Sequence, residues 1–157
     1  MASPPLIFRA LLFPCLLFQP GQATAAIIGS CTIVVGAPGT LTVNSGITVL
    51  GSQQAGGSAA GVTVTPNSVL CSVLNLLDCF SISSPAPASF LTAPTAGGTN
   101  VTFATAFRLN GGPQHPGNTP LRVANGSYSM AVDLTAARTN GVFTVGFYQS
   151  QVTVRCE

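Results

Sequence analysis

The chain has 157 residues, of which only 5% are charged, and its formal net charge is +2 at pH 7. The five basic and three acidic side chains are too few for the basic surface that nucleic-acid binding requires. We therefore expect no nucleic-acid partner.

Residues 1–25 are predicted to be an export signal peptide. Arg9 is the only early charge, residues 10–18 are mostly apolar, and residues 23–25 (Ala-Thr-Ala) form a small-x-small cleavage site. The apolar run is shorter than the roughly 20 residues that cross a bilayer, so no membrane span is expected after cleavage. A lipoprotein signal ending at Cys31 is the alternative, but the apolar run ends too far upstream. The remaining residues, 26–157, have the size of one domain.

Four cysteines remain after the signal is removed: Cys31, Cys71, Cys79 and Cys156. An even number of cysteines in an exported chain predicts two disulfides, and the sequence alone does not choose among the three connectivities. Zinc is the competing interpretation, but no pair shows the short C-x2-C spacing. We expect no metal and no cofactor.

The first half of the secreted chain contains several short predicted strands. Residues 31–35 form the first strand, residues 40–43 and 46–50 a hairpin, and residues 51–61 a loop rich in glycine, alanine, serine and glutamine. Residues 61–65 form a further strand that places Val62 and Val64 on one face and stops at Pro66.

Residues 71–79 differ from these strands because their apolar side chains are clustered. Val73, Leu74, Leu76 and Leu77 predict one helical turn or a loop lid, which a 71–79 disulfide would hold in place. The alternative is a buried corner of the fold. The sequence leaves both interpretations open.

From residue 80 onward, apolar and polar residues alternate with the period of β-strands. The apolar sets are Phe80 and Ile82, then Val101, Phe103, Phe107 and Leu109, then Tyr128, Met130, Val132 and Leu134, then Phe143, Val145 and Phe147, then Val152, Val154 and Cys156. Asn-Gly pairs at 110–111, 125–126 and 140–141 lie near the strand ends, where tight turns need positive φ. About ten short strands predict an all-β, two-sheet sandwich as a single domain over residues 26–157, with a closed barrel as the alternative.

No catalytic arrangement is evident, and we predict that the protein is not an enzyme. A Ser-His-Asp triad would require His115, the single histidine, which lies in a proline- and glycine-rich loop. A carboxylate pair would require Asp78 and Asp133 to meet, whereas capping or surface positions explain both. Tyr148 is expected to be either an exposed contact residue or a hydrogen-bonded corner tyrosine.

Three segments resemble the bacterial spore-coat-U proteins, which are related to the archaic chaperone–usher pilus subunits. Cys31-Thr32 is followed by residues 39–43 (Gly-Thr-Leu-Thr-Val), and a further strand runs towards Cys71. Residues 141–148 and 151–155 resemble the family's last two segments. The resemblance implies an immunoglobulin-like, pilin-like sandwich that lacks one strand, which a periplasmic chaperone and then a neighbouring subunit would donate. It also implies a Cys31–Cys71 disulfide, with Cys79 then paired to Cys156. The alternative is a 31–156 bridge between the terminal strands together with a small 71–79 loop.

We therefore expect a secreted structural subunit that reaches the cell surface through the periplasm and assembles with copies or homologous subunits. An outer-membrane usher is a further implied partner. The assembly edge is predicted at Ile27, Ile28, Ile33, Val35, Val152 and Val154. Only residues 26–30 precede Cys31 after the expected cleavage, which leaves three options: an earlier cleavage, donation of residues 27–35 as a unit, or no polymerisation of this kind. The alternative function is a monomeric adhesion module with its site on loops 51–60, 93–99 and 111–120.

Overall fold

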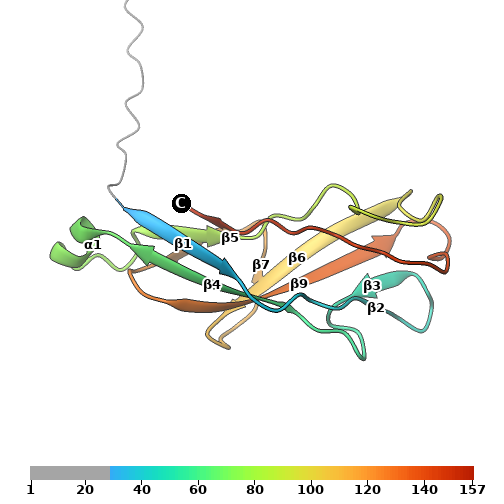
Figure 1. Ribbon diagram of the computed structural model, residues 1–157, viewed down its shortest axis with the longest axis horizontal. Helices are drawn as coiled ribbons and strands as arrows, with labels where there is room; N and C mark the ends of the chain where they lie inside the picture. The colour runs from blue at the N-terminus through green and yellow to red at the C-terminus, as the bar shows by residue number, and fades with distance from the viewer. Residues whose placement is uncertain (1–28) are drawn as a thin grey trace, which may run out of the picture.

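The computed structural model describes residues 29–157, so the predicted signal peptide and Ile27 and Ile28 lie outside the described residues. The described chain forms two antiparallel sheets and one short helix in an elongated shape (Figure 1). The predicted all-β, two-sheet architecture is confirmed, in place of one closed barrel.

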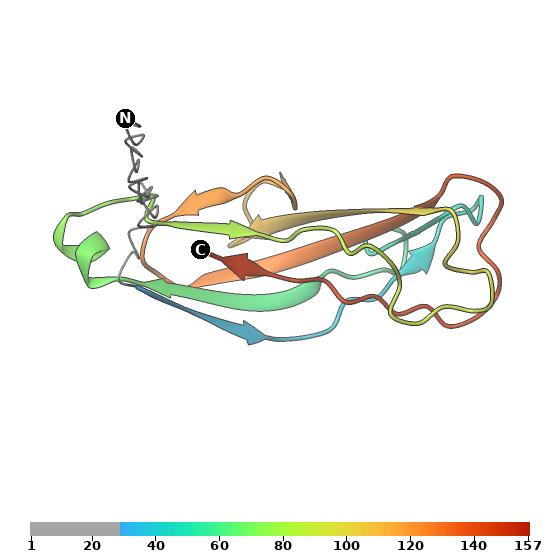
Figure 2. The same ribbon diagram turned by 90° about the horizontal axis from the view of Figure 1, so that it is seen from above.

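The first sheet contains seven strands and the second contains three. The first comprises β1 (Ser30–Val35), β2 (Thr42–Val43), β3 (Val49–Gly51), β4 (Ala60–Asn67), β6 (Val101–Leu109), β7 (His115–Pro116) and β9 (Tyr128–Arg138). The second comprises β5 (Phe80–Ser83), β8 (Leu121–Val123) and β10 (Arg155–Cys156). The helix α1 (Val69–Val73) follows β4 at one end of the molecule (Figures 1 and 2).

Strand β9 is the centre of the larger sheet. It pairs with β6 along one side, and with β4 and then β3 along the other. Between the last β4 partner and the first β3 partner, Ser52 completes the ladder. Its amide donates to the Leu134 carbonyl at 3.0 Å, and its hydroxyl accepts from the Leu134 amide at 3.2 Å. The long strand is therefore bonded along both sides.

The core lies between the sheets and follows the alternation predicted from the sequence. One buried cluster joins β4, β6 and β9 of the larger sheet to β5 and β8 of the smaller one. Its members are Val62, Val64, Cys71, Phe80, Ile82, Phe107, Val123, Met130 and Val132. Burying these faces removes apolar surface from water, which is the main stabilising contribution of such a sandwich.

Two boundaries differ from the sequence prediction. Strand β4 continues through Pro66, which is opposite Cys31 on β1, instead of stopping there. Residues 143–147 were predicted as a strand and form a loop, in which Phe143 is buried while Val145 is fully exposed. Among residues 29–157 no strand pairs with this segment, and alternation without a hydrogen-bonded neighbour does not hold a segment in a sheet.

The Asn110-Gly111 turn agrees with the prediction. Both residues have positive φ, 51° and 70°, and the Gly112 amide donates to the Leu109 carbonyl at 2.9 Å. Asparagine and glycine tolerate this backbone region better than other residues, which explains the pair at the end of β6.

The two predicted disulfides are present, but with a different connectivity from the one the family resemblance implied. Cys31 is bonded to Cys156, and Cys71 is bonded to Cys79. The 31–71 and 79–156 pairing is therefore wrong. The physical reason is topological, because β1 and β10 are the facing edges of the two sheets, and Cys79 ends the short loop that starts at Cys71.

Candidate assembly groove

The two long sides of the sandwich differ in how the sheets are connected. On the side of β6, Gly117 donates its amide to the Thr105 carbonyl at 2.7 Å and accepts from the Ser84 amide at 2.9 Å. A Cβ at Gly117 would collide with both neighbours, so the close approach requires glycine. On the opposite side, the edge strands β1 and β10 are joined by the Cys31–Cys156 disulfide. The second side is open beyond that bond.

The open side contains a groove of about 690 Å³. One wall is formed by the end of β1 and residues 37–41, and the other by residues 146–154 in the last part of the chain. The floor is the sandwich interior, formed by Leu50, Val62, Val132 and Leu134. The groove floor therefore consists of apolar core side chains, each 4–9% exposed.

Neither wall has a strand partner across the groove. Within residues 29–157, β1 pairs with β4 alone, and no backbone hydrogen bond engages residues 150–154. Residues 151–157 are predicted to be one strand, yet within residues 29–157 only its last three residues pair. Arg155 and Cys156 lie opposite Ser83 and Ile82, and Glu157 exchanges two backbone hydrogen bonds with Ser81. On the β5 side, Pro85 and Pro87 have no amide hydrogen with which to continue the ladder.

Residues 150–154 nevertheless have the side-chain alternation of a strand. Val152 and Val154 are half-buried and pack against the core, whereas Gln151 and Thr153 are exposed. Ser150 also lines the groove, and its hydroxyl is buried with no hydrogen-bond partner in residues 29–157. The segment is thus shaped for pairing but lacks a partner strand.

Three of the predicted edge residues line the groove: Val35, Val152 and Val154. Ile33 lies on β1 but is not part of the lining, and Ile27 and Ile28 lie outside the described residues. Sequence reasoning did not identify Leu41, Leu50 or Phe147 as groove residues. In the sequence, each of them is only an apolar residue next to a turn. That pattern does not specify which sheet edge the side chain faces.

A second exposed apolar surface lies at the α1 end of the molecule, and we call it the apolar tip. Its six aliphatic side chains are 45–76% exposed: Val69, Leu70, Val73, Leu74, Leu76 and Leu77. A helical turn is present, but it spans Val69–Val73 and so begins before the predicted cluster and includes only Val73 of it. The alternative of a buried corner is wrong, because Cys71 is the one buried residue of this helix. Six clustered aliphatic side chains exposed to water indicate a contact surface, since single exposed residues are normal but such groups are not.

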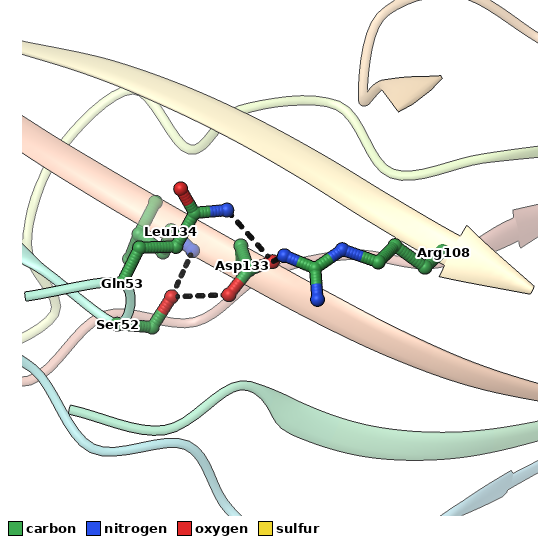
Figure 3. Close-up of polar contacts among 5 residues, drawn as sticks. All are labelled: Ser52, Gln53, Arg108, Asp133 and Leu134. Atoms are coloured by element: carbon green, nitrogen blue, oxygen red, sulfur yellow. Dashed lines mark hydrogen bonds and ion pairs between the residues drawn. The ribbon is translucent and has the colours of Figure 1, made fainter. Parts of the chain in front are cut away.

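The ionisable residues considered for catalysis are not brought together by hydrogen bonds. Asp133 is 5% exposed, and its carboxylate accepts three hydrogen bonds (Figure 3). The donors are the Ser52 hydroxyl at 2.8 Å, the Gln53 side-chain amide at 3.0 Å and the Arg108 guanidinium at 3.3 Å. Asp133 lies on the face of β9 that carries the polar residues, as predicted, but the Ser52–Gln53 turn covers this side chain. The cluster thus joins the end of β3 to β9 and β6.

Asp78 and His115 lie in other surroundings. The Asp78 carbonyl accepts from Arg122 at 3.3 Å, and the His115 ring lies 5.7 Å from that of Phe107. Tyr148 is the hydrogen-bonded tyrosine of the two alternatives, because its hydroxyl donates to the Thr144 carbonyl at 2.8 Å and its ring contacts Phe90 and Phe143.

In the part of the chain that the structure covers, no three histidine, cysteine or acidic side chains are grouped to hold a metal ion. No helix among residues 29–157 is long and apolar enough to cross a membrane. Comparison with protein-family models, curated proteins and solved structures gives no match.

Proposed function

We propose that this protein is a secreted structural subunit of a surface assembly, pilus-like or coat-like, and that it assembles by accepting a β-strand in the groove. The observation that carries the proposal is the groove itself, an apolar slot between two unpaired strand edges. A strand placed there can bond to backbone groups on one wall or both while its alternate side chains cover the floor.

The energetics favour such an addition. Each aliphatic side chain that becomes fully buried contributes about 1.5–3 kcal/mol. The floor residues Leu50, Val62, Val132 and Leu134 are already only 4–9% exposed, so this contribution comes from the donated side chains that pack on them. The immunoglobulin-like and pilin-like description of the fold, and the roles of a periplasmic chaperone and an outer-membrane usher, belong to the same proposal.

The groove-edge prediction compares two neighbouring valines of β1. Val35 lines the groove and is 80% exposed, whereas Val34 has the opposite parity, does not line the groove, and is 57% exposed. We expect Val35→Asp to raise the critical concentration of assembly by about tenfold or more, because an added strand would bury the carboxylate without a partner. Val34→Asp is the matched control and should assemble like the wild-type protein.

Sedimentation velocity and electron microscopy of the mature protein would measure this effect. Both variants should unfold at nearly the wild-type denaturant concentration, since exposed substitutions usually change stability by less than about 0.5 kcal/mol. Equal assembly of the two variants would contradict strand addition at this edge. A monodisperse, heat-stable wild-type monomer that binds a ligand saturably would instead favour the adhesion-module alternative.

A further inference from the structure

The end opposite the apolar tip is also apolar, and we call it the loop end. It brings together the β2–β3 turn and the loops around residues 91–94 and 142–147 (Figures 1 and 2). The Phe143 amide donates to the Ile47 carbonyl at 2.8 Å, and the Leu91 amide donates to the Gln149 carbonyl at 2.8 Å. Its exposed apolar side chains are Ile47, Leu91, Val142, Val145 and Phe147.

We infer that the apolar tip of one copy docks on the loop end of the next copy, as a second contact between subunits. This inference rests on the proposed strand addition for its direction, and on the two exposed surfaces for its chemistry. A contact between different surfaces of one molecule repeats head to tail, and it produces a filament when the rotation between copies does not close a ring.

The path of the chain favours a second copy as the occupant of the tip. The described chain begins at Gly29, where an added Cβ would lie 3.0 Å from Cβ of Ser68, the residue that immediately precedes α1. A residue of extended chain spans at most about 3.6 Å. Insertion of Ile27 and Ile28 into a neighbouring groove would therefore bring the tip to within about 10 Å of that groove.

The orientation of the groove selects the loop end as the surface that the tip meets. Phe147 lines the groove and belongs to the loop end, whereas the Cys31–Cys156 disulfide joins the groove walls towards the tip. The two walls run in opposite directions, so an inserted strand is antiparallel to one wall and parallel to the other. Because the disulfide crosses the end towards the tip, the donating chain leaves the groove at the end near Phe147, and the body of the donating copy continues beyond the loop end.

The tip is held with its aliphatic side chains outward. The Cys71–Cys79 disulfide closes it, and the Asn125 side-chain amide donates to the Ser68 carbonyl and to the Ser72 hydroxyl, both at 2.7 Å. These bonds fix the turn before any partner arrives, which lowers the entropic cost of docking. The tip surface is thus part of the folded domain.

The charges also favour a copy of this chain over a lipid surface. The six tip residues include no aromatic and no basic side chain, which are the residues that anchor proteins at bilayer interfaces. The tip carries the exposed Asp78, whose carbonyl accepts from Arg122 at 3.3 Å, and the loop end carries Arg138. Neither the Asp78 carboxylate nor Arg138 forms an ion pair within residues 29–157, and docking of the tip on the loop end brings the two to the same interface.

The test uses paired substitutions in the full mature protein. Leu74→Ser with Leu77→Ser alters the tip, Val142→Ser with Val145→Ser alters the loop end, and Val34→Ser is the exposed control outside both surfaces. Each pair should raise the critical concentration by about tenfold or more, and the control by less than about twofold. Circular dichroism and disulfide mapping would verify that each variant is folded.

Cross-linking determines which surfaces meet. Copies carrying Leu77→Cys are mixed with copies carrying Val145→Cys and treated with a short bismaleimide. Cross-links between the two kinds of copy support the inference, whereas tip-to-tip cross-links overturn it. Binding to phosphatidylcholine vesicles is measured for the wild-type protein and for the Leu74→Ser, Leu77→Ser variant. If the wild-type protein binds and the variant does not, the inference is overturned, because the tip then binds a bilayer.

The outcomes separate this inference from the proposed function. If Val35→Asp blocks assembly and the double substitution at the tip (Leu74→Ser with Leu77→Ser) does not, strand addition stands and the end-to-end contact is refuted. If the tip pair blocks assembly and Val35→Asp does not, the end-to-end contact stands and strand addition is refuted. A wild-type protein that stays monomeric at all attainable concentrations refutes both.

Discussion

At the scale of single residues, Asp133 shows how a polar side chain stabilises this sandwich. The carboxylate is buried, and its three donors come from Ser52, Gln53 and Arg108 (Figure 3). Because the Ser52 hydroxyl also accepts from the Leu134 amide, the cluster completes the ladder of β9 between β4 and β3. Buried polar groups that lose their partners are costly, so the members of the cluster depend on one another.

We expect Asp133→Ala to lower the free energy of unfolding by about 1–3 kcal/mol, because it leaves the Ser52 and Gln53 donors without their acceptor. Arg108→Ala should cost less than about 1 kcal/mol, since the Arg108 side chain is 41% exposed and the ion pair is screened by solvent. Urea unfolding of both variants measures the difference. Equal losses would show that the ion pair, and not the buried hydrogen bonds, carries the stability.

At the scale of elements, the last segment of the chain is the least complete part of the fold. Residues 150–154 alternate like a strand and pack two valines on the core, yet their backbone groups have no partner in the described structure. Strand β9, by contrast, is bonded to neighbours on both sides. The two segments should therefore differ in local stability.

Hydrogen exchange measures this difference directly. In monomeric protein, the amides of Val152, Thr153 and Val154 should exchange close to the rate of an unfolded chain, whereas those in the middle of β9 are protected. Assembled protein should protect residues 152–154, because an added strand pairs with them. Protection of this segment in the monomer, or no change on assembly, would contradict the role proposed for the groove.

At the scale of the whole molecule, the two disulfides have different tasks. Cys31–Cys156 links residues 125 apart in the sequence and joins the edges of the two sheets, while Cys71–Cys79 spans eight residues and closes the tip. A crosslink stabilises mainly by restricting the unfolded chain, and the effect increases with the length of the closed loop.

Replacing Cys31 and Cys156 by serine should lower the free energy of unfolding by about 4–5 kcal/mol, and replacing Cys71 and Cys79 by about 2–3 kcal/mol. Equilibrium denaturation of the two double variants provides the comparison. The opposite order of the two losses would show that strain or contacts in the folded state outweigh chain entropy.

The sequence alone determined the elements whose residues alternate against a regular neighbour. Strands β1, β4, β5, β6 and β9 lie where the apolar period of two predicts them, because side chains on one face must be buried together. Residues 143–147 have the same pattern and form no strand, and residues 151–154 have it but have no backbone partner among residues 29–157. The local pattern specifies which residues can share a face, but a strand also requires backbone partners, which lie far away in the chain.

Tertiary structure decided which edges face each other, and with them the disulfide pairing, the groove and the tip. Val35, Val152 and Val154 were predicted as edge residues through the family resemblance, whereas Leu41 and Phe147 reach the groove only through the course of their loops. From the sequence, the leucines after Cys71 were as consistent with a buried corner as with an exposed turn. Hydrophobicity measures the cost of leaving a side chain in water, and only the folded arrangement determines whether the same chain covers it or leaves it for a partner.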